Sequence, residues 1–357
     1  MPYEIEKYRR KFLNSLRERS FRCSSKEIAL STTLFMREIV GGAQYENFDQ
    51  LVELLKEERT WLMAAEPSEF VISNVVLSAL RMVREESTRR TRGAEDDFNP
   101  YDSLKLWNAQ SFGEKQESSS SGRKSSSKVP RKAIVAALNE FVTEIETCRG
   151  NMCAQAADHI CTGDIVITHS LSKSQTLREF FAAARKVHKF QVLCVDEEMD
   201  DAETLLSVDV MPAMRHATRV VISAAALLPD GSCIAPSGSL LLCLSAKRHS
   251  VPVSVCAAFY KVSPCFLPDV DTINKLDGAA QIVPFSESDR SLSLAHIVNP
   301  TFDIIPAQLI SLYISHTSAV TPPHVYRLIV EYYHPDDINY VNTLMYSSNE
   351  TSKAIST

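Results

Sequence analysis

Apolar residues recur at helical spacing through the first ninety or so positions of the chain. Ser24 and Glu27 have the spacing of a capping box, in which each side chain bonds the backbone amide of the other residue, so we expect a helix after Ser24. Apolar positions three and four residues apart predict a second helix over about 48–64 and a third after Glu69. The N-terminal part of the chain is therefore predicted to be helical.

This pattern stops between about residues 88 and 130. The stretch opens with Arg89, Arg90 and Arg92 and continues with clusters of serine. Such a composition buries too little apolar surface to offset the entropy lost on ordering. We predict a disordered Ser/Arg-rich insertion here, inside an N-terminal domain that covers residues 1–160.

A different pattern begins after residue 160, where short apolar runs alternate with amphipathic stretches. Buried strands are predicted at about 164–168, 190–195, 219–223 and 251–256, and helices at about 174–187 and 239–249. Strands that alternate with helices form a mostly parallel sheet, because each right-handed crossover returns the chain to the same edge. The predicted fold class is therefore α/β, with a helical N-terminal domain, a Rossmann-like domain over 161–345 and a flexible tail over 346–357.

Two further helical segments complete the expected fold. Residues 133–160 read as one long helix or two. A closing helix is expected to begin at Pro322, because proline is tolerated in the first turn of a helix. Its expected apolar face consists of Val325, Leu328, Ile329 and Tyr332.

Composition excludes several classes of function. The chain has 357 residues, of which 45% are hydrophobic, and this is enough for two cores. Its net charge of -6 argues against direct binding of nucleic acid, and no apolar stretch is long enough to span a membrane. The start of the sequence lacks the apolar core of a secretory signal, and the nine cysteines are scattered, several within apolar runs. We therefore expect a cytosolic protein with neither a nucleic-acid nor a membrane partner.

The most specific motifs lie near the C-terminus. They are Asn299-Pro-Thr-Phe-Asp-Ile-Ile-Pro306, Tyr326-Arg-Leu328 and Glu331-Tyr-Tyr-His-Pro-Asp-Asp337, accompanied by Ala64-Ala-Glu-Pro-Ser-Glu69 and Ala246-Lys-Arg-His-Ser-Val-Pro-Val253. With these motifs the chain resembles the alpha, beta and delta family of regulatory subunits of eukaryotic translation initiation factor 2B. The fold of that family is related to methylthioribose-phosphate isomerases. The C-terminal motifs, together with Lys261, Ser263 and Pro264, are more similar to the beta branch than to the alpha or delta branch.

This resemblance implies a non-catalytic regulatory or scaffold subunit of the guanine-nucleotide exchange factor complex for initiation factor 2. It implies the delta, gamma, epsilon and alpha subunits of factor 2B as partners. It also implies binding to the alpha subunit of initiation factor 2 and regulation by phosphorylation of that subunit in the integrated stress response. By the same resemblance, Asn139, Glu140 and Glu144 would contact this substrate, and Tyr333 and His334 would lie at an interface between subunits.

Positions that are catalytic in the related isomerases differ in this chain. Where the resemblance places a catalytic cysteine and a catalytic aspartate, the sequence has Ser170 and Ala225. Ala225 cannot transfer a proton, and a serine without an adjacent base is a poor acid or base. The phosphate-binding arginine of those enzymes has no counterpart in the acidic run after Val195, and the chain between Val195 and Arg219 is shorter than the family pattern. We expect no enzymatic activity, and we expect an abbreviated strand–helix unit after Val195.

No cofactor, metal site or small-molecule substrate is expected either. The glycine motifs that bind nucleotide phosphates do not occur, and His159, Cys161 and His169 match no common zinc-binding spacing. The loop over 168–174 precedes a helix and has amides that suit an anion, although an ordinary solvated turn explains it as well. Two alternatives stay open, namely a sugar-phosphate isomerase-like enzyme and a divergent homodimeric paralogue.

Overall fold

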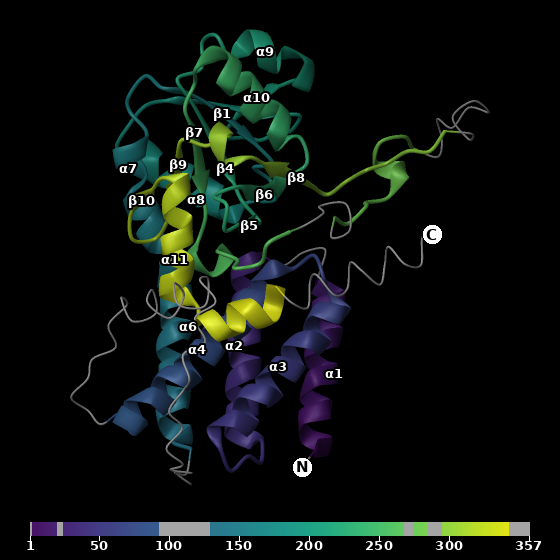
Figure 1. The fold of residues 1–357 in the computed structure, drawn as a ribbon. Helices are drawn as coiled ribbons and strands as arrows, with labels where there is room; N and C mark the ends of the chain where they lie inside the picture. Colours follow the sequence, from purple (N-terminus) through teal and green to yellow (C-terminus); the bar gives the residue numbers. More distant parts are fainter. Residues whose placement is uncertain (1, 20–23, 93–128, 268–273, 285–294, 343–357) are drawn as a thin grey trace. The chain divides into compact units, whose positions relative to one another are not determined.

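The computed structural model of this chain divides into two compact units (Figure 1). It describes residues 2–19, 24–92, 129–267, 274–284 and 295–342. The first unit comprises Met1–Asn151, Ala258–Phe266 and His324–Thr357, and the second comprises Met152–Ala257 and Leu267–Pro323. Two units were expected with a division near residue 160, but the C-terminal residues after 323 group with the N-terminal helices and not with the sheet.

Helices build the first unit. They are α1 (Pro2–Arg19), α2 (Ser25–Gly42), α3 (Phe48–Ala65), α4 (Phe70–Arg92), α6 (Arg131–Ala154) and α11 (Val325–Tyr332), followed by a helical stretch at residues 335–342. Helix α4 contacts both α2 and α3, and its buried face includes Ile72, Val76 and Leu80. The helices predicted from apolar spacing in this part of the chain agree with these bounds, because that spacing produces one buried stripe on each helix.

Two local expectations in the first unit need correction. Ser24 does precede α2, but its side chain makes no capping hydrogen bond, and the amide of Glu27 bonds the carbonyl oxygen of Ser24 at 2.9 Å instead. Helix α4 continues to Arg92, beyond the expected start of the insertion at residue 88, and Arg89 forms an ion pair with Glu86 one turn earlier. Residues 93–128 of the predicted insertion and the predicted tail over 346–357 lie outside the described residues.

Segments from three parts of the sequence meet in the core of the first unit. The ring of Phe259 lies 5.6 Å from that of Phe141 on α6 and 5.9 Å from that of Tyr332 on α11. The amide group of Asn74 on α4 donates to the carbonyl oxygen of Tyr260 at 3.1 Å. On α11, Val325 and Ile329 are buried as predicted, Leu328 is half-buried, and Val330 is buried although it was not expected to be. These contacts explain why α11 groups with the N-terminal helices.

A mixed, mostly parallel sheet forms the centre of the second unit, with the strand order β10-β9-β7-β4-β1-β2-β3. The strands are β1 (Ile165–His169), β2 (Gln191–Val195), β3 (Glu203–Leu205), β4 (Arg219–Ser223), β7 (Val253–Cys256), β9 (Leu312–Ile314) and β10 (Ala319–Val320). Only the pair β9–β10 is antiparallel. The helices of this unit are α7 (Ala156–His159), α8 (Gln175–Arg185), α9 (Val210–Ala213) and α10 (Ser239–His249). The fold class predicted from the alternation of strands and helices is confirmed.

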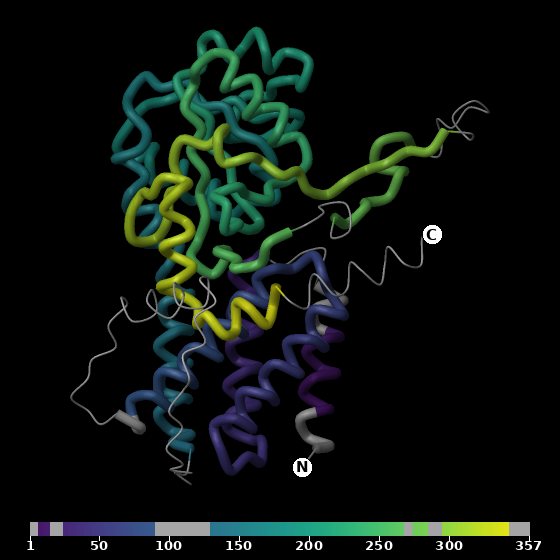
Figure 2. Tube along the Cα trace, in the orientation of Figure 1, coloured from purple at the N-terminus to yellow at the C-terminus, as the bar shows by residue number. Residues whose placement is uncertain are grey.

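A second, antiparallel sheet was not predicted. It has the order β5-β6-β8, with β5 (Ala226–Leu227), β6 (Cys233–Pro236) and β8 (Phe302–Ile305). Before β8 two segments of the chain run side by side as a two-stranded ribbon. The amide of Asp277 donates to the carbonyl oxygen of Asn299 at 2.8 Å, and the amide of Thr301 donates to the carbonyl oxygen of Lys275 at 2.9 Å. Figure 2 shows this ribbon leading away from β8.

The connection between β2 and β3 is unusually short for two parallel neighbours. Parallel strands normally need a crossover of a dozen or more residues, but here residues 196–202 suffice. The reason is that β3 pairs only with the last residues of β2, so the chain has little distance to return. With the single-turn helix α9 after β3, this agrees with the abbreviated strand–helix unit that the sequence predicts.

Candidate functional site

The carboxyl edge of the parallel sheet is the first candidate site, because open α/β sheets bind ligands where their strands end. The backbone turns sharply there. Ser170 follows β1 and Asp196 follows β2, and both have a φ of 53°, which residues other than glycine rarely adopt. Non-glycine residues in this conformation cluster at functional sites.

A carboxylate of the chain itself occupies the loop after β1. The backbone amide of Ser172 donates to Oε2 of Glu197 at 2.9 Å, and the Ser172 hydroxyl donates to Oε1 at 2.6 Å. Burial works to raise the pKa of Glu197, but the hydrogen bonds from Ser172, together with smaller contributions from Cys194 and His169, outweigh it, and the pKa lies below its ordinary value. Donors that suit an external anion are therefore already used by Glu197.

The backbone amides at the N-terminus of α10 are also bonded by a carboxylate of the chain. Oδ2 of Asp303, on β8, accepts hydrogen bonds from the amides of Gly238 at 2.8 Å and Leu240 at 3.1 Å. Gly238 has a φ of 97°, and a Cβ atom at this position would lie 3.0 Å from Nε2 of His169. That nitrogen lies 2.7 Å from the carbonyl oxygen of Ser237 and donates to it. Only glycine suits this position, because both the backbone conformation and the imidazole ring exclude a side chain.

The two positions that match catalytic residues of the isomerases lie near this edge. Ser170 is buried, and no hydrogen bond joins its hydroxyl to a histidine or carboxylate among the contacts of the described residues. Ala225 lies between β4 and β5, where its amide donates to the carbonyl oxygen of Ile234 at 2.7 Å. Within the described ranges, no three or more His, Cys, Asp and Glu side chains are grouped to hold a metal ion. None of the helices that the structure describes is long and apolar enough to cross a membrane.

A second candidate surface lies on α6 in the first unit. Asn139, Glu140 and Glu144 are all exposed, and the two glutamates lie one turn apart on the same side of the helix. Their orientation follows from the opposite side of α6, where Leu138 and Phe141 are buried. The three predicted contact residues therefore share one accessible surface, which we call the α6 face. Oδ1 of Asn139 accepts a hydrogen bond from Arg37 of α2 at 3.1 Å.

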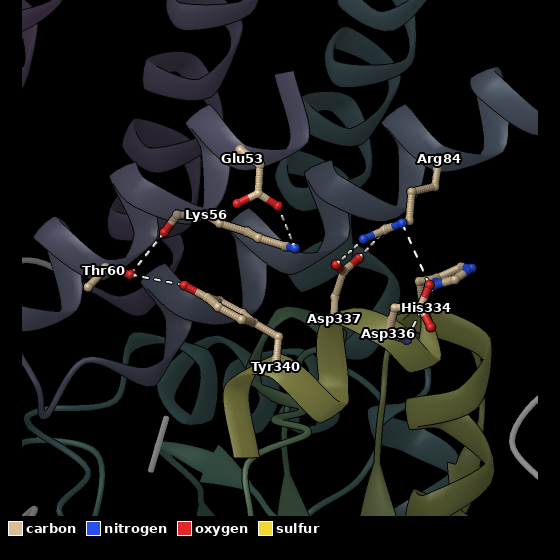
Figure 3. A network of polar contacts seen from close by, with 8 residues as sticks. All are labelled: Glu53, Lys56, Thr60, Arg84, His334, Asp336, Asp337 and Tyr340. Carbon is tan, nitrogen blue, oxygen red and sulfur yellow. Dashed lines mark hydrogen bonds and ion pairs between the residues drawn. The ribbon is translucent and has the colours of Figure 1, made fainter. Parts of the chain in front are cut away.

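Tyr333 and His334 lie in different surroundings, although they are adjacent in the sequence. The Tyr333 side chain is buried and donates to the carbonyl oxygen of Val262 at 2.6 Å, so it packs inside its own unit. A direct contact between Tyr333 and a partner does not fit this burial. His334 is half-buried beside Asp336, and burial lowers its pKa (Figure 3). Of these two residues, only His334 has a side chain that is accessible to a partner.

Three residues of the carboxyl edge were missed by the motifs of the sequence. They are Ser172, Glu197 and Asp303. Glu197 belongs to an acidic run that predicted repulsion of anions, and Asp303 belongs to the C-terminal motif, but neither pattern identifies a hydrogen-bonding partner. A serine just before a predicted helix, followed by a carboxylate after the next strand, is the signal that was available.

Comparisons with known proteins agree with the resemblance seen in the motifs. The model of the initiation factor 2 subunit family matches residues 22–198 and 200–322. The chain is 27% identical over 360 residues to eIF2B subunit beta of Dictyostelium discoideum, which covers 88% of this chain and 92% of that protein. It is 24% identical over 365 residues to eIF2B subunit beta of Schizosaccharomyces pombe, covering 87% and 92%.

A solved structure has the same fold. It is the tetrameric eIF2B-beta2-delta2 complex from C. thermophilum, one chain of which superposes with a TM-score of 0.66 at 18% identity, covering 92% of this chain and 95% of that chain. The family match extends over far more than half of the sequence and includes residues of both units. The chain therefore belongs to the initiation factor 2 subunit family.

Proposed function

We propose that this chain is a non-catalytic regulatory subunit of the guanine-nucleotide exchange factor complex for translation initiation factor 2. The observation that carries the proposal is the match to eIF2B beta subunits along most of the chain. The carboxyl edge of the sheet supports a role without catalysis. Ala225 has no group that transfers protons, and the carboxylates of Glu197 and Asp303 take hydrogen-bond donors that a phosphorylated substrate would need.

An exposed apolar surface in the second unit supports pairing with another subunit. Five exposed apolar residues, here called the α9–α10 patch, lie on or next to these two helices: Leu206 and Val208 shortly before α9, Met211 on α9, and Leu241 and Leu244 on α10. Helices α9 and α10 are in contact (Figure 1). Exposed apolar residues that gather on neighbouring elements mark interaction surfaces. We assign the delta subunit to this patch, with the gamma, epsilon and alpha subunits completing the complex.

The α6 face supports binding of the alpha subunit of initiation factor 2. Its two glutamates give the face a negative charge, which suits a basic surface on a partner and guides encounter with it. Through this contact the chain would help to sense phosphorylation of the substrate in the integrated stress response. His334 is retained as a partner contact and Tyr333 is not, and the proposed location is the cytosol.

Purification of the tagged full-length chain from its native cytosol, with mass spectrometry of the bound proteins, tests the assembly. We expect the other eIF2B subunits and initiation factor 2 to be recovered. Val208→Glu places a charge in the α9–α10 patch and should remove the delta subunit. Val187→Glu is the matched control, because Val187 is also exposed but lies outside the patch.

Two results would contradict the proposal. Recovery of the chain alone as a homodimer would favour the divergent paralogue. Turnover of a sugar phosphate by the purified chain would favour the isomerase-like enzyme. If Val208→Glu and Val187→Glu retain the delta subunit equally well, the α9–α10 patch is not the pairing surface.

A further inference from the structure

The carboxylate of Glu197 lies against the loop between β1 and α8. Both carboxylate oxygens of Glu197 accept hydrogen bonds from Ser172, one from its amide and one from its hydroxyl. Ser172 lies in the turn that leads into α8, and backbone amides of such turns, together with serine hydroxyls, are donors with which proteins hold phosphate groups. Glu197 therefore interacts with Ser172 as the oxygens of a bound phosphate would.

The unpaired hydroxyl of Thr168, at the end of β1, is a second and independent observation near this loop. Thr168 of β1 is fully buried, and its Oγ1 has no hydrogen-bond partner among the residues that the structure describes. Thr168 pairs with Cys194 of β2, so both side chains project from the same face of the sheet. The Cys194 thiol lies 3.5 Å from Oε2 of Glu197. Thr168 thus offers a further hydrogen-bonding group on the face where the carboxylate lies.

The turn after β2 fixes the position of Glu197. The amide of Asp196 donates to the carbonyl oxygen of Leu205 at 2.8 Å, and Oδ1 of Asp196 accepts from the amide of Ser207 at 2.9 Å. These bonds attach the turn to the end of β3 and to the residues after it. The short connection between β2 and β3 therefore holds Glu197 toward the loop after β1.

We propose that Glu197 is an internal occupant of an anion-binding loop formed by Ser172 and the residues after β1, and that it excludes phosphate monoesters from this loop. The inference rests on the proposed non-catalytic function and names the residue that keeps phosphorylated ligands out. Removal of the carboxylate frees both donors of Ser172 and removes a negative charge that repels the ligand. The loop should then bind a phosphate monoester.

Calorimetric titration of the full-length chain with ribose 5-phosphate tests this proposal, with ribose as the control for contacts that need no phosphate. We expect Glu197→Ala to bind ribose 5-phosphate at least about tenfold more tightly than the unmodified chain, because a competing occupant lowers apparent affinity in proportion to the time it fills the site. Glu198→Ala is the matched control, since it removes the same charge from the adjacent, exposed residue. Addition of Ser172→Ala to Glu197→Ala removes the hydroxyl donor and leaves the amide, so it should reduce the gain.

Each outcome decides a separate question. Equal affinities of Glu197→Ala and Glu198→Ala would overturn the inference and leave the proposed function untouched. Binding by the unmodified chain as strong as that of Glu197→Ala would also overturn the inference, whereas turnover by the unmodified chain would contradict the non-catalytic function itself. If Glu197→Ala fails to fold, Glu197→Gln keeps the size of the side chain and removes its charge. It should show a smaller gain in the same direction, and no gain would overturn the inference.

Discussion

Arg84 on α4 holds the buried carboxylate of Asp337 with two hydrogen bonds, of 2.9 Å to Oδ2 and 2.7 Å to Oδ1 (Figure 3). Asp337 is 0% exposed, so loss of Arg84 would leave a buried charge without its partner. We expect Arg84→Met to lower the free energy of unfolding by about 3 kcal/mol, measured by urea denaturation. Asp336→Asn is the control, because Asp336 is half exposed and lies 3.7 Å from Arg84, so its loss should cost less than about 1 kcal/mol.

A second buried carboxylate ties α1 to α3. Arg9 donates to Oε2 of Glu58 at 2.8 Å, and its guanidinium lies 5.3 Å from the centre of the Trp61 ring. Glu58 is only 2% exposed, so Arg9→Met should release α1. We expect faster proteolysis within α1 and a change in Trp61 fluorescence, recorded in a Trp107→Phe background so that only Trp61 emits. Arg10→Met, which removes an exposed pair with Glu6, should change neither signal.

The burial of Tyr333 separates a packing role from an interface role. Tyr333→Phe removes the hydrogen bond to Val262 and leaves a buried carbonyl oxygen unpaired. This should destabilise the chain by about 1–2 kcal/mol without weakening recovery of partner subunits. Tyr8→Phe, at an exposed tyrosine, should leave stability unchanged. Loss of partners by Tyr333→Phe at full stability would restore the interface role.

The hydrogen bonds to Glu197 predict a pH dependence. Its pKa is lowered in the folded chain, so the stability that it contributes is present above the pKa of the unfolded chain and is lost as pH falls through the folded pKa. Ser172→Ala should therefore cost about 1 kcal/mol at pH 7. The cost should shrink as the pH falls through the lowered pKa of the folded chain, where Glu197 becomes protonated. A difference between the two chains that stays constant as the pH is lowered from 7 until Glu197 is protonated would contradict this linkage.

The α6 face predicts a defect in function without a defect in folding. Glu140→Lys reverses a charge on an exposed position, so the chain should remain folded while nucleotide exchange by the reconstituted complex slows. The exchange rates of the unmodified and Glu140→Lys complexes should differ at low salt and converge at high salt, because salt screens this interaction. Glu57→Lys, which changes the same charge at an exposed position of α3, is the control. An exchange rate unchanged by Glu140→Lys would remove this residue from the proposed contact.

The sequence predicts best those elements whose burial repeats with a regular period. The stripe through Ile72, Val76 and Leu80 predicts α4, and the apolar run before His169 predicts β1. Strands β5 and β6 were missed because they are short, and the second ends at Pro236, where the missing amide argues against a strand. Short strands are specified by their neighbours in space, which a local pattern does not contain.

The candidate site shows the same limit. Exposure of Glu140 and Glu144 follows from helical periodicity, so the α6 face could be predicted. Burial of Tyr333 could not, because it depends on the carbonyl oxygen of Val262, far away in the sequence. The same holds for the contact of Asp303 with Gly238, which needs two distant segments to be placed together. Motifs identify a family more readily than they identify hydrogen-bonding partners.

The short connection between β2 and β3 also bears on the order in which the sheet assembles. Pairing of parallel strands is usually slow, because a whole crossover must be ordered before the strands meet. Here Leu193 meets Glu203 after a short loop, and closing such a loop costs little entropy. Loops of about ten residues close within roughly 10–100 ns. This edge of the sheet therefore depends on local contacts and can act as an early template onto which β1 and then β4 are added.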